Sequence, residues 1–218
     1  MSENSERDSI CRLAKSLFDR GLTIGSSGNI SVRLADGWLM TPTGSSMGNL
    51  DPNEISKLDS NGELISGKNP TKESFLHIAM YDERPDSGAV VHLHSTHSVA
   101  VSCLAGIDKK NVLPPITAYY VMKIGKLPLV PYFPPGDINL AKAVKEMASN
   151  HHAVLLANHG PVVAGKTLED AVYAIEELEE TARLFLLLRN MKTQYLNEKQ
   201  VKTLEAVSYT HLTLPTKA

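Results

Sequence analysis

Apolar residues recur with two different spacings along this chain, and each spacing predicts one kind of element. In residues 10–18 they follow the three- and four-residue spacing of a helix with one apolar face. Residues 30–34 alternate between apolar and polar positions, as a half-buried strand does. Asp36-Gly37 then predicts a tight turn, so that residues 38–40 complete a hairpin.

The rest of the chain predicts further strands and helices without strict alternation. A second hairpin is predicted around Asn61-Gly62, and Thr71 is predicted to cap a helix that extends to about residue 84. The Pro-rich segments 113–116 and 127–136 are interpreted as connections with at most a short strand between them. The other expected elements are strands at 89–94, 153–157 and 161–164 and helices at 98–104, 137–147 and 167–192. This mixture favours a layered α/β domain.

Composition narrows the class of protein. The chain has 218 residues, 42% of them hydrophobic, which is an ordinary globular balance. Lysine and arginine number 22 against 24 aspartates and glutamates, a formal charge of 22 − 24 = −2, and no basic stripe favours nucleic acid as a partner. The apolar stretches are too short to cross a membrane, and residues 1–8 lack a signal-peptide pattern. We expect a cytoplasmic protein in which Cys11 and Cys103 are buried free thiols.

The composition changes at residue 207. Residues 207–218 resemble the in-frame translation of an adapter used to prepare sequencing libraries. We interpret them as a non-native read-through tail rather than as a genuine C-terminus, and exclude them from functional reasoning. Residues 1–206 are expected to form a single domain.

Three histidines are candidates for a metal site. His92 and His94 are two residues apart in a predicted strand, so that both side chains point to the same side. His159 lies at the exit of a second predicted buried strand. Histidine is a natural ligand for zinc and similar divalent ions. The alternative interpretation is a polar strand face without a metal.

Two small-residue loops and one charged pair are candidates for binding the substrate and transferring a proton. Residues 25–29 and 43–46 are rich in N–H and hydroxyl donors, which can surround a phosphate, although ordinary turns have the same composition. Thr71-Lys72-Glu73 places a cation and a carboxylate at a predicted helix N-terminus. We interpret them as a substrate anchor beside a general acid/base; the alternative is a capped first turn.

Five motifs in order make the chain resemble the class II aldolase/adducin family from about residue 12 to residue 197. They are Gly28-Asn29-Ile30-Ser31-Val32-Arg33, Thr41-Pro42-Thr43-Gly44, Thr71-Lys72-Glu73, His92-Leu93-His94 and Asn158-His159-Gly160. The resemblance implies a three-layer α/β/α sandwich. It also implies homotetramers whose active sites lie at subunit interfaces.

The resemblance assigns roles to individual residues. One divalent ion per subunit, expected to be Zn²⁺, would be held by His92, His94 and His159. Glu73 would be the catalytic acid/base and could also ligate the metal when substrate is absent. The residues expected to bind the substrate phosphate are Gly28, Asn29, Thr43, Gly44, Thr71 and Lys72.

One branch of the family fits best. Lys72 stands where fuculose-phosphate aldolases have serine, and residues 114–122 and 130–137 are similar to the 3-oxo-tetronate 4-phosphate decarboxylases. That resemblance implies a phosphorylated sugar acid as substrate, which loses carbon dioxide through a metal-stabilised enediolate to give dihydroxyacetone phosphate. Tyr119 aligns with proton donors of relatives, and its neighbour Tyr120 stays an alternative.

Other functions remain open at this level. A class II phosphosugar aldolase, fuculose-phosphate-like, or a pentulose-phosphate 4-epimerase would use the same metal site. A non-catalytic scaffold resembling the adducin head domain is disfavoured, because the three histidines and Glu73 are all present. His77, four residues after Glu73, is interpreted as a supporting or structural residue rather than a ligand.

Overall fold

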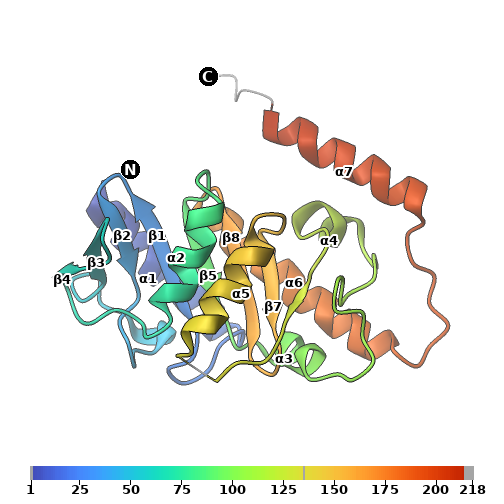
Figure 1. Cartoon of the computed structure of the whole chain (residues 1–218), viewed down its shortest axis with the longest axis horizontal. Helices are drawn as coiled ribbons and strands as arrows, with labels where there is room; N and C mark the ends of the chain where they lie inside the picture. Colours follow the sequence, from blue (N-terminus) through green and yellow to red (C-terminus); the bar gives the residue numbers. More distant parts are fainter. Residues whose placement is uncertain (1, 135, 214–218) are drawn as a thin grey trace.

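A mixed β-sheet forms the centre of the protein, between two layers of helices (Figure 1). The computed structural model describes residues 2–134 and 136–213, with side chains described as far as residue 207. Within them, eight strands are ordered β4-β3-β2-β1-β5-β8-β7-β6, with all neighbours antiparallel except the parallel pair β6 and β7. The strands are β1 (Asn29–Leu34), β2 (Gly37–Met40), β3 (Ser56–Asp59), β4 (Leu64–Ser66), β5 (Ala89–His92), β6 (Leu129–Val130), β7 (Ala153–Leu156) and β8 (Gly160–Gly165).

The helices cover both faces of this sheet. Helices α1 (Glu3–Asp19), α3 (Thr96–Ser102) and α6 (Leu168–Leu188) pack on one face, and α2 (Ser74–Glu83) and α5 (Ile138–Ala148) pack on the other. Neighbouring residues of β5 divide between the two cores, because Val91 packs with α1 and α6 while Val90 packs with α2 and α5. The predicted three-layer α/β/α sandwich is therefore confirmed.

Two helices differ from what the sequence predicts: one lies between the Pro-rich segments, and the other, α2, begins at a different residue. A short helix, α4 (Ala118–Lys123), lies where at most a strand was predicted, with Thr117 as its N-cap. Helix α2 begins after Glu73, not after Thr71, and Glu73 makes no side-chain capping bond. The Thr71 hydroxyl oxygen instead accepts a hydrogen bond from the backbone N–H of Glu73, which forms a turn ahead of the helix.

The C-terminal segment lies outside the three layers. Helix α7 (Glu198–Thr213) lies beside α4, away from the sheet (Figure 1). Because α7 continues across residue 207, its backbone has no break where a read-through tail is expected to begin. The assignment of residues 207–218 to a tail stays a prediction, and residues 214–218 lie outside the described residues.

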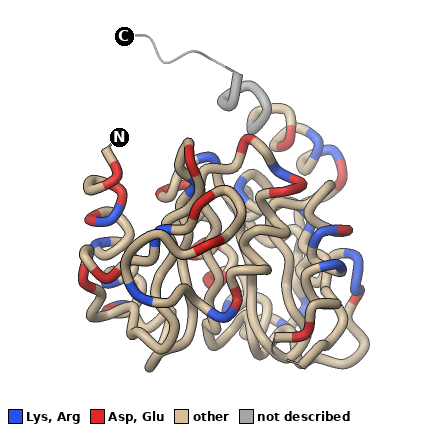
Figure 2. The backbone as a smooth tube through the Cα atoms, turned by 60° about the vertical axis from the view of Figure 1, so that its left-hand side comes forward, with Lys and Arg blue, Asp and Glu red and all other residues tan. Residues whose placement is uncertain are grey.

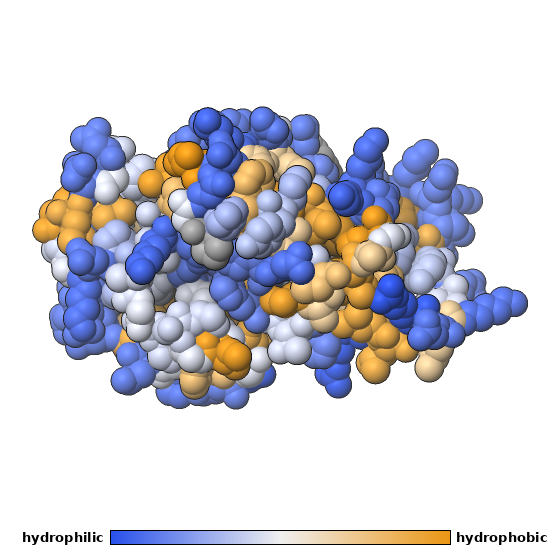
Figure 3. All heavy atoms as spheres, turned by 60° about the horizontal axis from the view of Figure 1, so that its bottom comes forward, coloured by the Kyte–Doolittle hydropathy of each residue, from blue (hydrophilic) through white to orange (hydrophobic). Residues whose placement is uncertain are grey.

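The surface carries mixed charge and polarity. Basic and acidic residues are interspersed along the chain (Figure 2). On the face seen in Figure 3, apolar and hydrophilic side chains lie side by side, with the broadest apolar area right of centre. No helix in the described part of the chain is long and apolar enough to cross a membrane. Both cysteines are free thiols, but neither is buried as expected: Cys11 on α1 is partly exposed, and Cys103, directly after α3, is exposed.

Candidate metal centre and substrate cavity

The centre of the site is His92, the last residue of strand β5. Its side chain is fully buried, and its Nδ1 lies 2.8 Å from the carbonyl oxygen of Pro161 on the adjacent strand β8. Since a carbonyl oxygen only accepts, Nδ1 carries the proton and Nε2 is left with a lone pair. The neighbouring strand thus fixes the imidazole in the tautomer that a metal ligand requires.

His159 reaches the same point from the turn between β7 and β8. Asn158 adopts a left-handed conformation (φ 56°), which asparagine tolerates better than most residues. Gly160 then passes so close to Leu93 that a Cβ at position 160 would lie 2.2 Å from the Leu93 carbonyl oxygen. A residue without a side chain is therefore required directly after His159.

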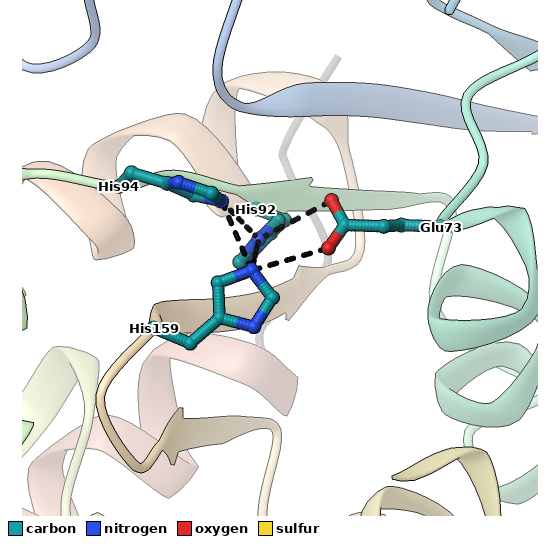
Figure 4. A group of neighbouring side chains, drawn as sticks. All are labelled: Glu73, His92, His94 and His159. Atoms are coloured by element: carbon teal, nitrogen blue, oxygen red, sulfur yellow. Dashed lines mark hydrogen bonds and ion pairs between the residues drawn. The ribbon is translucent and has the colours of Figure 1, made fainter. Parts of the chain in front are cut away.

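The three histidines meet through their Nε2 atoms (Figure 4). The Nε2 of His92 lies 3.0 Å from that of His94 and 3.3 Å from that of His159, and the latter two are 3.1 Å apart. Strand β5 ends at His92, so His94 lies in the segment before α3 rather than in the strand. The start of α3 is held by Glu179, whose carboxylate accepts hydrogen bonds from the backbone N–H groups of His97 and Ser98.

Glu73 faces the histidines from the opposite side (Figure 4). Its Oε1 lies 3.1 Å from Nε2 of His159, and its Oε2 lies 3.5 Å from Nε2 of His92. Glu73 occupies the N-cap position of α2, but its carboxylate points to the histidines instead of capping the helix. The structure thus brings together all four residues that the sequence predicted for the metal and the acid/base.

This donor set fits a divalent metal ion. Three imidazole nitrogens that converge within 3.3 Å repel one another unless a proton or a cation lies between them, and the Nε2 of His92 carries a lone pair. The ligand atoms of Glu73, His92, His94 and His159 all lie within 4.8 Å of one another. Nitrogen ligands with one carboxylate suit zinc and related divalent ions.

Burial and neighbouring charge set the protonation of this cluster. Burial lowers the pKa of His92 to about 3 and also lowers the pKa of His94, so both imidazoles favour the neutral form that binds metal. Burial alone raises the pKa of Glu73. His92 and the hydrogen bonds from His159 and Asn29 outweigh that effect and hold the pKa below its ordinary value, which keeps Glu73 a carboxylate.

We expect the metal-free protein to lose stability as the pH falls from about 6.5 towards 4. His77 and His92 are fully buried, and burial lowers their pKa values to about 4 and about 3. The unfolded chain therefore binds more protons in this pH range, and the free energy of unfolding falls by up to about 1.4 kcal/mol per pH unit for each histidine. Urea unfolding of the metal-free protein at several pH values measures this slope.

A His77→Gln variant is the control for this pH dependence, because glutamine does not titrate in this range. Its unfolding free energy should fall less steeply with acid than that of the wild type. Equal slopes for the two proteins would contradict the assignment of His77 as a neutral buried histidine.

A cavity of about 410 Å³ lies beside the histidine cluster. Its lining includes every residue predicted to bind phosphate, together with Glu73, His94 and His159. The predicted phosphate residues in the lining are Gly28, Asn29, Thr43, Gly44, Thr71 and Lys72. Four further lining residues were not assigned a role individually, although each lies in a segment that the sequence analysis singled out: Ser26, Ser27, Pro42 and Gly136. A more open hollow of about 750 Å³ is lined by α7 alone and brings no such groups together.

Two of the predicted phosphate residues have distinct surroundings. Lys72 is exposed and forms no ion pair with any described residue, so its ammonium group is available to an anion. The side-chain amide of Asn29, by contrast, is already engaged within the protein: Nδ2 donates to Glu73, and Oδ1 lies 2.5 Å from Nε2 of His77. Its side chain therefore contacts Glu73, which the sequence did not predict.

His77 belongs to a buried hydrogen-bonded group with Ser31 and Tyr81, and only His77 of these three was singled out from the sequence. It is completely buried, and its Nδ1 lies 2.7 Å from the hydroxyl of Ser31, which in turn lies 2.9 Å from the hydroxyl of Tyr81. Ser31 and Tyr81 were missed as supporting residues. The signal in the sequence is the four-residue spacing of Glu73, His77 and Tyr81, which puts them on one face of a helix.

The structure distinguishes the two candidate tyrosines. Tyr120 is 1% exposed, its hydroxyl has no partner among the described residues, and burial raises its pKa. Tyr119, its neighbour on α4, is 67% exposed, and it does not line the cavity. Tyr119 is therefore the tyrosine that a molecule outside the core can reach.

Comparisons with known proteins identify the family of this chain. The Class II Aldolase and Adducin N-terminal domain matches residues 8–186. The 3-oxo-tetronate 4-phosphate decarboxylase of Escherichia coli (strain K12) is 49% identical over 205 residues, 94% of this chain and 97% of that protein. The L-fuculose phosphate aldolase of Methanococcus maripaludis (strain DSM 14266) is 40% identical over 183 residues, 84% of this chain and 96% of that protein.

A solved structure of a relative has the same fold. The crystal structure of YgbL from Escherichia coli superposes with a TM-score of 0.91 at 48% identity, and covers 93% of this chain and 99% of YgbL. The sequence match and the shared fold both span almost the whole described chain. This protein therefore belongs to the class II aldolase and adducin family.

Proposed function

We propose that this protein decarboxylates a 3-oxo-tetronate 4-phosphate to dihydroxyacetone phosphate and carbon dioxide. The observation that carries the proposal is the cluster of three histidines and Glu73 at a cavity that is also lined by Lys72, which has no ion-pair partner in the described part of the chain. Five relatives, 46–49% identical over most of the chain, bear the name of this decarboxylase.

The metal in our proposal is one Zn²⁺ ion per subunit, held by His92, His94 and His159. When bound, such an ion acts as a Lewis acid that draws electron density from substrate oxygens. Glu73 completes the coordination when substrate is absent, which its 3.1 Å distance from Nε2 of His159 supports. The lone pair of His92, fixed by Pro161, supports the assignment of the ligands.

The cavity residues orient the substrate. The backbone and hydroxyl donors of the loops around residues 28–29 and 43–44 and of Thr71 hold the phosphate, since such small-residue loops let N–H groups approach an anion. Gly28 has a left-handed backbone (φ 79°) that a side chain would strain. Lys72 adds positive charge for the phosphate or the substrate carboxylate.

Proton transfer completes the reaction. When the C1–C2 bond breaks, carbon dioxide leaves and the bonding electron pair stays on the substrate. A proton delivered to C2 then yields dihydroxyacetone phosphate. Glu73 lies beside the cluster; although it is a carboxylate in the free site, it can take up a proton from water and pass it to C2, with Tyr119 as the second proposed donor.

Tyr119 could act only in an assembly, because it does not line the cavity of its own subunit. We therefore include in the proposal a homotetramer in which Tyr119 enters the cavity of a neighbouring subunit. Exposed apolar side chains support such contacts: Tyr119 on α4, Leu187 in the last turn of α6 and Met191 just after α6 are each more than 60% exposed.

The test of the proposed function is a direct assay of product formation. Purified protein loaded with Zn²⁺ should release one carbon dioxide and one dihydroxyacetone phosphate per molecule of 3-oxo-tetronate 4-phosphate consumed. The same preparation is assayed with L-fuculose 1-phosphate. Aldehyde formation from that substrate, without carbon dioxide release from the sugar acid, would establish the aldolase alternative instead.

Lys72→Ser is expected to weaken kcat/KM for the sugar-acid phosphate by about 1.5–3 kcal/mol, the range for a hydrogen bond to a charged group. The loss follows because Lys72 lines the cavity and forms no ion pair with any residue that the structure describes. Steady-state kinetics measure it, and Lys142→Ser, on the exposed surface of α5, is the matched control. A change within about twofold would mean that Lys72 holds no substrate anion.

A further inference from the structure

A continuous chain of hydrogen-bonded side chains leads from Glu73 into the protein core. Nδ2 of Asn29 lies 2.8 Å from Oε2 of Glu73, and Oδ1 of Asn29 lies 2.5 Å from Nε2 of His77. On the other side of the imidazole, Ser31 Oγ lies 2.7 Å from Nδ1, and the Tyr81 hydroxyl lies 2.9 Å from Ser31 Oγ. Asn29, Ser31, His77 and Tyr81 are at most 5% exposed, so water does not compete for these bonds.

The carboxylate of Glu73 determines the direction of every bond in this chain. A carboxylate only accepts, so the NH₂ group of Asn29 donates to it and the amide oxygen faces His77. That oxygen requires a proton on Nε2 of His77. Burial lowers the pKa of His77 to about 4, so the neutral ring has a bare Nδ1. Ser31 donates to this Nδ1, and Tyr81 donates to Ser31, which leaves no polar atom of the chain unmatched.

The chain connects two elements that are anchored independently of the cavity. Glu73, His77 and Tyr81 follow one another at four-residue intervals along the start and inner face of α2, and Asn29 and Ser31 are two apart on β1. The end at Tyr81 is fixed by Arg33, whose guanidinium donates to the Tyr81 carbonyl (2.9 Å) and lies 4.6 Å from its ring centre. Of the five residues in this hydrogen-bond chain, only Glu73 and Asn29 line the cavity.

We infer that His77 is a positioning residue, which together with Ser31 and Tyr81 orients the Asn29 amide and thereby holds the Glu73 carboxylate beside His92 and His159. If the donor at Nε2 of His77 is lost, the Asn29 amide can rotate and present its oxygen to the carboxylate, which repels it. Glu73 would then lose its orientation although its own side chain is intact. This inference rests on the proposed function only for the kinetic consequence, because the hydrogen-bond chain exists without substrate.

The first experiment observes the bond directions without catalysis. Nitrogen-15 NMR of histidine-labelled, metal-free protein reports which ring nitrogen of each histidine is protonated, and the signal absent from His77→Gln identifies His77. We expect a neutral His77 with its proton on Nε2 at pH 7. A proton on Nδ1, or a doubly protonated ring at pH 7, would overturn the inferred direction of the chain.

The second experiment separates positioning from stability. His77→Leu removes both ring nitrogens, and we expect kcat to fall about 10- to 100-fold with KM changed less than about twofold, as for other residues that orient ligands. His77→Gln keeps an amide donor toward Asn29 and should recover most of kcat. If His77→Leu does not fold, Ser31→Ala takes its place, because it leaves the ring present but unmatched at Nδ1.

Ser56→Ala is the matched control for Ser31→Ala. Ser56 is equally buried and donates its hydroxyl to the Lys68 carbonyl, and it does not line the cavity. Both variants should lower Tm, whereas only Ser31→Ala should lower kcat. An equal loss of kcat in both, or full kcat in folded His77→Leu, would overturn the positioning role. If the wild type releases no carbon dioxide, the proposed reaction is wrong. The NMR result then still tests the directions of the hydrogen bonds from Glu73 to Tyr81.

Discussion

Glu73→Gln is expected to lower kcat about 100- to 10,000-fold, the usual contribution of a general acid/base, while the protein keeps its fold and its metal. Glutamine retains the shape of the side chain and can still accept the hydrogen bond from Nδ2 of Asn29, but it cannot hold a transferable proton. The three histidines proposed to hold the metal are unchanged. Steady-state kinetics and elemental analysis on the same preparation measure both quantities.

Glu146→Gln provides the control for this substitution, because Glu146 is an exposed carboxylate on α5 away from the cavity lining. Its kcat should equal that of the wild type. If metal-loaded Glu73→Gln turns over at nearly the wild-type rate, Glu73 is not the acid/base. If instead it loses metal, Glu73 acts mainly as a ligand.

His94→Ala is expected to reduce metal affinity and activity together, each by more than about 100-fold, because loss of even an outer partner of a metal-bound histidine costs about 10- to 100-fold. Two imidazoles and Glu73 would leave an incomplete set of ligands. Competition with a zinc chelator measures the affinity. His94 is only partly buried, so its removal should disturb the core less than removal of His92.

His151→Ala serves as the comparison for this loss, since His151 binds the Lys126 carbonyl and lies outside the histidine cluster. It should keep its zinc and its activity. Unchanged metal content and affinity in His94→Ala would rule out His94 as a ligand and leave the geometry of the cluster without a metal to explain it.

The elements that could be predicted from sequence are those whose causes are local. Helix α6 has a capping box at Thr167 and an apolar face. The predicted hairpin of β1 and β2 also forms, although its turn is Ala35-Asp36, one residue before the predicted Asp36-Gly37, because Gly37 already pairs with Leu34. Asp137 caps α5, as its sequence indicates. Side-chain periodicity and capping residues lie within a few positions of the structure they determine, so both can be read without a partner.

Helix α4 was missed because its stabilisation is mostly not local. It has only six residues, too few for a periodic pattern, and it lies between Pro-rich segments. Its N-cap Thr117 and the burial of Tyr120 in the core of the sheet are what hold it. The same burial decides that Tyr119, not Tyr120, is accessible, which neighbouring positions in a sequence cannot distinguish.

In the candidate site, the residue types could likewise be predicted from sequence, whereas the roles of their atoms could not. The identity of the three histidines, Glu73 and the small-residue loops was predictable, because metal and phosphate chemistry restrict which residue types can serve. The roles of individual atoms were decided by contacts between distant segments. Pro161 fixes the tautomer of His92 across 69 residues, and His77 reaches the Asn29 amide across 48. Hydrogen bonds of this kind depend on ångström-scale distances and on burial, which only the packed sheet and helices provide.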